Sequence, residues 1–435
     1  SGNADAFLAV NPSGYLYTAS HGWMIFTGTH WTRDNAEQRL ENTIAEVLRQ
    51  RQHAAIDSKR TAVVTAATPN AKRIRDCKFI LQSRLVADVA TFDIHDHLLN
   101  VRNGVIDLRT GRVSPHDHTL RMTHLVDCEY NPAANVGLFR NFLTGVIDGG
   151  DTTANWLQTI LGYCLTGDTR FEIVLYLHGK TRAGKGTTIE ALSALLGDLA
   201  RPLTFAALTE KRDPDASNFD LAPLRNARLV IADESDRRDR LNGAKLKALT
   251  GGNAISCCHK HRDFFSYRPK FKMLLVSNWP PNADADDDAI WSRLRVVEFP
   301  NSHAGSEDFT LKSRLKSEPY QQSLLAWLVQ GAIQFYQSGS IGIAAPEVVT
   351  KATQARRDDL DEVKQWIDTV CITGSDYFTE NQRVYQSYAK WCVDNGYTAK
   401  FQRSLTSSLN AKGYSSHLKK IEGTVKRGIS GILVQ

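Results

Sequence analysis

The chain has 435 residues, of which 42% are hydrophobic and 23% charged, and its formal net charge is +6 at pH 7. This length predicts two to four domains, and the composition excludes a disordered or membrane-spanning chain, because no apolar run approaches the ~20 residues of a transmembrane helix. The modest positive charge permits a polyanionic partner without requiring one, since 47 acidic residues offset most of the 53 basic ones.

The chain begins at Ser1-Gly2-Asn3, without an initiator methionine and without the basic and apolar regions of a signal peptide. We therefore expect a cytoplasmic protein, and a sequence cut from something longer. The seven cysteines are an odd number and most stand in apolar stretches, which is typical of reduced, buried thiols rather than of a disulfide framework.

Residues 1–148 are expected to form an N-terminal α+β domain. Strand-like residues at 98–108 are interrupted by Asn103-Gly104 and followed by Thr110-Gly111, which predicts a segment rich in β-hairpins. The charged stretch at 34–60 has helical character.

Residues 149–344 alternate between helices and short apolar strands. The helices are expected at 152–165 and 185–196, and the strands at 173–177, 228–232 and 271–276. Because the strands lack polar alternation, they predict an α/β domain whose central parallel sheet is buried on both faces.

Residues 345–435 predict a small domain of the winged-helix type. Helices are expected at 352–369, 382–395 and 401–412, and two short strands around a turn at 424–434. Winged helices bind DNA or protein, and both possibilities stay open here. Cations surround the proposed recognition helix and wing, namely Lys400, Arg403, Lys412, Lys419, Lys420, Lys426 and Arg427.

A glycine-rich turn from Gly179 to Lys185 separates the strand at 173–177 from the helix at 185–196. In this setting the turn predicts a phosphate-binding loop, in which backbone N–H groups and the helix N-terminus face the phosphates and Lys185 reaches the β- and γ-phosphate oxygens. The alternative is a glycine-rich turn with an incidental lysine. The expected nucleotide-binding residues are Gly179, Thr181, Arg182, Ala183, Gly184, Lys185, Gly186, Thr187 and Thr188.

One position departs from the usual phosphate loop. Gly186 stands where a Ser or Thr ordinarily ligates Mg²⁺, and Thr187 and Thr188 come directly after it. Thr187 is the expected hydroxyl ligand of the metal, one residue later on the helix than in the usual motif.

Two further apolar strands end in polar side chains. The run at 229–232 is followed by Asp233 and Glu234, and the run at 274–276 leads to Asn278. Beside a phosphate loop, Asp233 is expected to hold Mg²⁺, Glu234 to orient and deprotonate the attacking water, and Asn278 to contact the γ-phosphate and that water. Taken alone, an apolar run that ends in Asp-Glu is usually just a strand that meets solvent.

Arg293 lies beyond the Asn278 strand and after an acidic loop, Asp284 to Asp288. An arginine in this place is positioned to cross a subunit boundary and neutralise charge on a neighbour's γ-phosphate, which contributes on the order of 10³–10⁵ in rate. The alternative is a salt bridge to the same aspartate cluster.

Residues 255–267 read as two strands around a basic tip formed by His259, Lys260, His261 and Arg262. Such a hairpin, projecting into the pore of a ring, would grip DNA phosphates. One alternative is a solvated turn; another is a metal site with Cys257 and Cys258, which their adjacent spacing disfavours. Two histidine pairs also look like metal ligands, but we interpret them as ordinary surface residues: His95 with His97, and His116 with His118.

In this order the motifs resemble those of the superfamily 3 helicases, a branch of the AAA+ ATPases. More narrowly, the chain is similar to the helicase part of phage and plasmid primase–helicases, relatives of the poxvirus primase–helicase. Residues 103–111 are similar to the family's N-terminal helicase-associated domain, and Gly179 to Thr187 match its phosphate loop, including a glycine after the lysine. The other matching motifs are Asp233-Glu234, Lys245 with Thr250-Gly251-Gly252, Lys260-His261, Asn278 and Arg293.

The resemblance implies a homo-hexamer that hydrolyses ATP with Mg²⁺ between subunits and moves 3′-to-5′ on single-stranded or forked DNA. It implies replication of a phage, plasmid or other mobile element in a bacterial host or a virus-infected cell. An upstream primase domain or replication partner is expected, and no membrane partner. Two rivals stay open: an ATP-regulated origin-binding or loading protein without strand separation, and a P-loop kinase for a small molecule.

Overall fold

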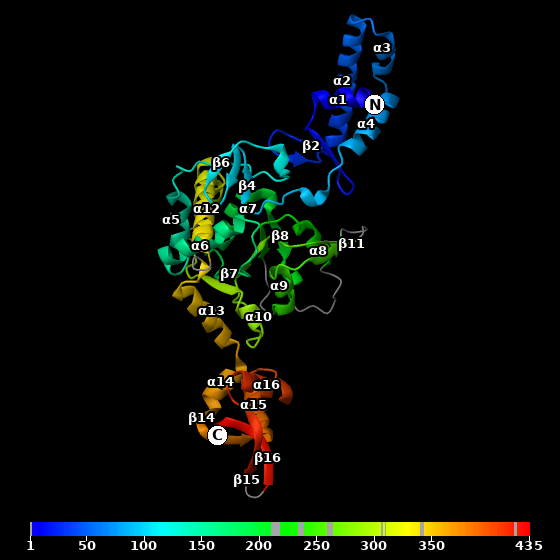
Figure 1. Ribbon diagram of the computed structural model, residues 1–435. Coiled ribbons are helices and arrows are strands. Elements are labelled where there is room, and N and C mark those ends of the chain that lie inside the picture. Colours follow the sequence, from blue (N-terminus) through cyan, green and yellow to red (C-terminus); the bar gives the residue numbers. More distant parts are fainter. Residues whose placement is uncertain are drawn as a thin grey trace.

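The computed structural model describes residues 2–209, 218–233, 239–258, 264–305, 308, 310–339, 343–421 and 424–435. Figure 1 shows an N-terminal unit (residues 2–85), a central body (residues 98–338) and a C-terminal unit (residues 362–435). The two smaller units lie at opposite ends of the central body (Figure 1). No helix in the described ranges is long and apolar enough to span a bilayer.

The N-terminal unit packs helices against a small antiparallel sheet of order β1-β2-β3. Its own hydrophobic cluster includes Phe7, Trp23, Leu40 and Leu81. The predicted helix at 34–60 is confirmed as α2, which ends at Asp57. The elements are α1 (Gly2–Val10), β1 (Tyr15–Thr18), β2 (Gly22–Phe26), β3 (Trp31–Thr32), α2 (Ala36–Asp57), α3 (Thr61–Ala67) and α4 (Ala71–Arg84).

The hairpin predicted at residues 98–111 is confirmed as an antiparallel sheet of order β4-β5-β6. Its strands are β4 (Leu98–Val101), β5 (Gly104–Asp107) and β6 (Arg112–Ser114). The buried side chains of β4 and β5 belong to the same hydrophobic cluster as the helices of the central body. This small sheet is therefore part of the central body, while the domain boundary at residue 148 stays a prediction.

The central body contains the predicted parallel sheet, with the strand order β13-β7-β12-β9-β8. Adjacent strands pair in parallel throughout, as in Ser277 opposite His178 and Leu274 opposite Ile231. Alternate side chains of each strand enter two different hydrophobic clusters, so the sheet is buried on both faces. The strands are β7 (Val174–Gly179), β8 (Ala200–Thr204), β9 (Leu229–Asp233), β12 (Lys272–Ser277) and β13 (Leu294–Phe299).

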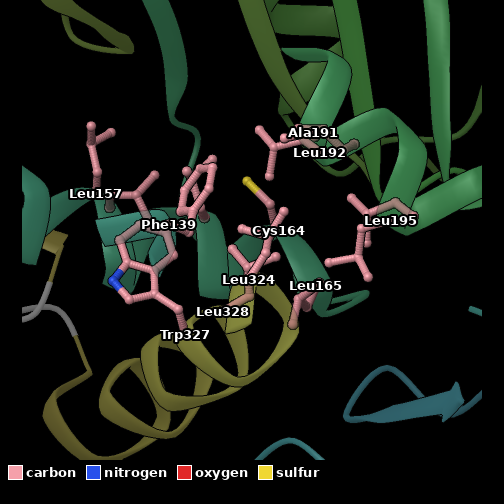
Figure 2. Close-up of a cluster of buried hydrophobic side chains, with 14 of the residues drawn as sticks. Phe139, Leu157, Cys164, Leu165, Ala191, Leu192, Leu195, Leu324, Trp327 and Leu328 are labelled. Atoms are coloured by element: carbon pink, nitrogen blue, oxygen red, sulfur yellow. The ribbon is translucent and has the colours of Figure 1, made fainter. Parts of the chain in front are cut away.

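The larger cluster lies between one face of the sheet and its helices. Figure 2 shows Phe139, Cys164, Leu195 and Trp327 converging within it. These helices are α5 (Gly137–Val146), α6 (Gly150–Leu165), α7 (Lys185–Leu196), α11 (Leu311–Leu315) and α12 (Glu318–Ser338). Elements around the other face are α8 (Asn218–Leu221), α9 (Gly243–Thr250), β10 (Ile255–Cys258), β11 (Phe264–Tyr267) and α10 (Asp288–Trp291).

Two glycines set the distance between α6 and α12. A Cβ atom on Gly162 would overlap the backbone of Gly331 and Ala332, and one on Gly331 would overlap the carbonyl of Gln158. The two backbones are therefore in direct contact. Around this contact, Gln158 Nε2 donates to the Trp327 carbonyl at 3.0 Å.

The C-terminal unit combines helices with an antiparallel sheet of order β14-β16-β15. The predicted helix at 352–369 is wrong as a single element: it is broken between α13 and α14, where Asp361 caps α14 by accepting from the Lys364 N–H at 2.9 Å. The two short strands predicted within 424–434 are also wrong: these residues form one strand, β16, which pairs with the earlier strand β15. The elements are α13 (Glu347–Asp359), α14 (Glu362–Val370), β14 (Cys371–Glu380), α15 (Asn381–Asp394), α16 (Gln402–Ala411), β15 (Ser416–Ile421) and β16 (Thr424–Val434).

The cysteines are free thiols, as the sequence predicts, and all except the half-buried Cys371 are buried. Burial raises the pKa of Cys77, Cys128 and Cys164 to about 11. These thiols therefore remain protonated and unreactive near neutral pH.

Candidate active site

The glycine-rich turn lies where the sequence predicts it, between β7 and α7, and two of its glycines are required by geometry. Gly179 has φ 155°, and a Cβ there would overlap the Phe299 carbonyl of the neighbouring strand β13. Gly184 has φ 96° and lies against the Val146 side chain of α5. The turn is thus fixed by strand β13 on one side and by α5 on the other.

Lys185 opens α7, and its side chain is buried beneath the turn. Its Nζ donates to the carbonyls of Gly179 at 2.6 Å and Lys180 at 2.7 Å, and to Asn278 Oδ1 at 3.0 Å. Burial lowers the pKa of Lys185, while the carboxylate of Asp233 opposes this shift. Because β7, β12 and β9 are adjacent parallel strands, their carboxyl ends bring the lysine, the asparagine and the aspartate to one edge of the sheet.

A cavity of about 780 Å³ opens at this edge. Its size suits a nucleoside triphosphate, because ligand pockets range from ≈ 300 to 1,000 Å³. Nearly all of the predicted nucleotide residues line it, namely Thr181, Arg182, Ala183, Gly184, Lys185, Gly186 and Thr187, together with Asp233 and Asn278. Gly179 does not line the cavity, but its carbonyl accepts a hydrogen bond from Lys185 Nζ. Glu234 lies outside the described residues.

The sequence does not predict another part of the cavity lining. It consists of Phe142 and Val146 from α5 and Leu311 and Lys312 from α11, together with His303 and Asp308. The apolar side chains of Phe142, Val146 and Leu311 form a surface, here called the base wall, against which a planar base can pack. No motif marks these residues, since they are ordinary members of two helices that the fold brings to the phosphate loop.

The segment after β13 covers the turn. Ser302 Oγ donates to the Thr181 carbonyl at 2.8 Å, and the His303 N–H donates to the Arg182 carbonyl at 3.0 Å. Arg182 itself has a left-handed backbone, with φ 62°. The apex of the turn is therefore held by hydrogen bonds from a segment more than a hundred residues away in the chain.

The two threonines after Gly186 have different surroundings. Thr188 is buried, and its hydroxyl donates to the Gly184 carbonyl at 3.0 Å, whereas Thr187 lines the cavity. A Cβ at Gly186 would meet nothing within 4 Å, so crowding does not explain the glycine at the usual metal-ligand position. Thr187 and Asp233 both line the cavity, and their side-chain oxygen atoms are of the kind that a hard cation such as Mg²⁺ prefers.

For the ATP hydrolysis that the sequence predicts at this site, we expect Thr187→Ala to raise the Mg²⁺ concentration needed for half-maximal activity by about ten-fold, because one oxygen ligand is lost. Thr188→Val is the matched control, since it keeps the buried shape and removes a hydroxyl that only bonds within the helix. Magnesium titrations of steady-state phosphate release check the result. A higher Mg²⁺ requirement in the Thr188 variant alone would show that Thr188, and not Thr187, is the metal ligand.

Arg293 lies away from this cavity. It is 9% exposed, and its guanidinium donates to Glu172, to Thr250 Oγ1 at 3.1 Å and to the Ala289 carbonyl at 2.7 Å. The salt bridge is thus to Glu172, not to the aspartate cluster that the sequence suggested as the alternative partner. In this arrangement Arg293 binds residues of its own subunit. Its function as an arginine finger stays a prediction, and that function requires these contacts to break.

Strands β10 and β11 pair antiparallel at the place where the sequence predicts a DNA-binding hairpin. Its tip residues, His259, Lys260, His261 and Arg262, lie outside the described residues. Cys257 is buried in the cluster beneath the sheet, and burial raises the pKa of its thiol. Within the described parts of the chain, no group of three or more His, Cys, Asp or Glu side chains is arranged to hold a metal ion.

The cations of the C-terminal unit do not form one surface. Lys400 and Lys412 are directed to Asp286 of the central body, and Lys426 pairs with Glu380 at 2.5 Å. The others are exposed, namely Arg403, Lys419, Lys420 and Arg427. Fewer cations of this unit are therefore available to bind DNA than the sequence suggests. The winged-helix assignment stays a prediction.

Comparison with known proteins gives two family matches. Residues 4–148 match the family described as "D5 N terminal like", and residues 177–293 match a family of unknown function (DUF5906). The second match contains the phosphate loop, Asp233 and Asn278, and it ends at Arg293.

Two viral proteins illustrate the relatives. "Putative helicase L207/L206" of Acanthamoeba polyphaga mimivirus is 25% identical over 424 residues, which are 87% of this chain and 44% of that protein. "Putative primase C962R" of African swine fever virus (isolate Warthog/Namibia/Wart80/1980) is 23% identical over 342 residues, 73% of this chain and 35% of that protein. The chain thus spans less than half the length of these relatives.

One solved structure, "The apo structure of NrS-1 C terminal region (305-718)", is 14% identical, with a TM-score of 0.45, and covers 78% of this chain and 95% of that chain. The chain is thus similar, over most of its length, to viral proteins named as a putative helicase and a putative primase, and its N-terminal part matches the D5 N terminal like family.

Proposed function

We propose that the chain is an ATP-dependent DNA helicase that works in the replication of a phage, plasmid or other mobile element. One observation carries the proposal. A single cavity at the carboxyl edge of the parallel sheet is lined by Lys185 from the start of α7 and by Asp233 and Asn278 from the ends of β9 and β12, with Lys185 Nζ 3.0 Å from Asn278 Oδ1. This is the arrangement expected for binding a triphosphate and detecting its hydrolysis.

In this proposal each residue of the cavity has a separate task. Lys185 and the N–H groups at the start of α7 bind the β- and γ-phosphates of ATP. Thr187 and Asp233 hold Mg²⁺, which neutralises phosphate charge when bound. Glu234 orients and deprotonates the attacking water, and Asn278 exchanges its contact with Lys185 for one with the γ-phosphate or that water.

The proposed assembly is a homo-hexameric ring around single-stranded or forked DNA, moving 3′-to-5′. The hairpin of β10 and β11 presents His259, Lys260, His261 and Arg262 to the DNA backbone, and Arg293 contributes to the site of the next subunit. The relatives named for helicase and primase activities support a function in viral replication. A primase domain or another replication partner would complete the system.

The test combines ATP hydrolysis with strand separation. We expect steady-state ATPase activity to rise when single-stranded DNA is added, and the chain to displace one strand of a forked duplex only with ATP and Mg²⁺. Lys260→Ala combined with His261→Ala should keep the basal ATPase activity and lose displacement, because the tip contacts DNA rather than nucleotide. DNA-stimulated ATPase without displacement would favour a loading protein instead, and ATPase indifferent to DNA would remove the proposal.

A further inference from the structure

The loop after Asn278 joins two residues of the proposed site. It runs from Trp279 to Asp287, between β12 and α10, and Arg293 comes just after α10. Because the loop is connected to Asn278 at one end and to α10 at the other, moving the loop changes the distance between Asn278 and Lys185 and also moves Arg293. The contacts that hold the loop in place bear directly on the geometry of the site.

The C-terminal unit holds this loop through Asp286. The carboxylate of Asp286 accepts from Lys400 Nζ at 2.8 Å, from Lys412 Nζ at 3.1 Å and from the Ser408 hydroxyl. All three donors belong to α16 or to the residues beside its ends. One side chain of the central body thus occupies the centre of a site built by the C-terminal unit.

Both lysines also bind carboxylates at the start of α14. Lys400 lies 3.4 Å from Glu362, and Lys412 lies 2.5 Å from Asp361. The side chains of Asp286, Lys400 and Lys412 are only 25%, 20% and 20% exposed. Partly buried charges in a shared network are screened less than isolated surface pairs, so these contacts restrain the loop more than ordinary salt bridges would.

The ionisation of Asp286 agrees with this arrangement. Burial alone would raise the pKa of the carboxyl, but hydrogen bonds from Lys400 and Ser408 and the charge of the lysines hold it well below the usual range. Asp286 is therefore ionised at any pH at which the protein is expected to work, and its attraction for the two lysines is always present.

The linking helix α13 holds the same loop from another side. Arg356 Nε donates to the Pro281 carbonyl at 3.0 Å, and Arg357 Nε donates to the Ala285 carbonyl at 2.8 Å. The C-terminal unit and the helix that leads to it thus hold the loop at several points along its length, including an ion pair between Lys400 and Asp284 at 3.8 Å. In Figure 1, α10, α13, α14 and α16 gather at this junction.

We propose that Asp286 is a positioning residue through which the C-terminal unit sets the geometry of Asn278 and so the rate of hydrolysis. The inference rests on the proposed ATPase function. Because Asn278 touches Lys185 directly, a loop that shifts by a fraction of an ångström moves the asparagine away from the reacting phosphate, and displacements near 1 Å can lower rates by ~10²-fold. Movement of the C-terminal unit is thereby coupled to catalysis.

The test compares the two sides of the contact in the full chain. Asp286→Asn should lower kcat for ATP hydrolysis about ten-fold and leave KM for ATP within about two-fold, because the phosphate loop and the base wall are untouched. Lys400→Met should do the same from the C-terminal side, and the double variant should be no slower than either single variant. Asp286→Glu, which keeps the charge, should recover part of kcat.

Lys364→Met is the matched control, since Lys364 pairs with Asp358 at 2.8 Å in the same region without touching the loop, and it should leave kcat unchanged. Equal losses in kcat for this control, additive losses in the double variant, or unchanged kcat in both single variants would overturn the inference. If Asp286→Asn does not fold, the kcat values of Lys400→Met and Lys412→Met test the inference without it. An inactive wild-type chain would overturn the proposed function and this inference together, whereas an active chain indifferent to these changes would overturn the inference only.

Discussion

Replacing Lys185 by alanine is expected to lower the ATPase rate by ~10²–10³-fold, the effect of removing a main electrostatic contact to a reacting group. The ammonium is the donor that joins the phosphate loop to Asn278, through contacts of 2.6 Å to the Gly179 carbonyl and 3.0 Å to Asn278 Oδ1. Its loss removes both the positive charge beneath the phosphates and the link to the sensing strand. Steady-state phosphate release, with and without single-stranded DNA, measures the effect.

Lys351→Ala is the control for this prediction, because Lys351 is an exposed helix residue paired with Glu347 and should leave the rate as it is. If sites are shared between subunits, adding excess Lys185→Ala protein to the wild type should depress activity more than dilution with buffer does. A Lys185→Ala protein that hydrolyses ATP at the normal rate would show that the cavity at the sheet edge is not the site of the reaction.

Replacing Arg228 by methionine is expected to lower the free energy of unfolding by about 3–4 kcal/mol, because a buried cation with several charge-assisted hydrogen bonds is removed. Arg228 is 8% exposed, and its guanidinium donates to the carbonyls of Leu165 at 2.6 Å, Asp96 at 2.9 Å and Leu98 at 3.1 Å. It thus satisfies the last turn of α6 and fixes the segment that leads from the N-terminal unit into the central body. Methionine fills a similar volume and satisfies none of these oxygens.

Thermal unfolding and limited proteolysis of the segment at 85–98 check this result. Arg201→Met is the comparison, because Arg201 is 38% exposed and forms one pair with Asp198 at 3.0 Å, so its loss should change the unfolding free energy by less than about 1 kcal/mol. Equal stability and equal cleavage in the two variants would mean that the carbonyls around Arg228 find water or other donors.

The parts that the sequence predicts well are those governed by local rules. Gly179 and Gly184 adopt backbone conformations that favour glycine, and the apolar strands β7, β9 and β12 lie on a sheet buried from both sides, so their motifs and periodicity are visible in the chain itself. The positions of Asp233 and Asn278 can be predicted as well, because the carboxyl ends of adjacent parallel strands lie at one edge of the sheet.

The rest depends on contacts between distant residues. Strand β14 escapes detection because its sequence is interrupted by Gly374-Ser375-Asp376, where the register shifts between Thr373 and Phe378. The base wall of Phe142 and Leu311 has no local signal at all. The partner of Arg293 could not be predicted either. Glu172 lies 121 residues away in the chain, whereas the aspartate cluster that the sequence suggests as the partner is close to Arg293.

The touching backbones of Gly162 and Gly331 have a mechanical consequence. Because their backbones are in direct contact, α6 and α12 cannot slide past each other without steric overlap, and α5, which carries Phe142, packs in the same hydrophobic cluster. A residue larger than glycine at either position would push the two helices apart and so disturb the cavity lining at Phe142.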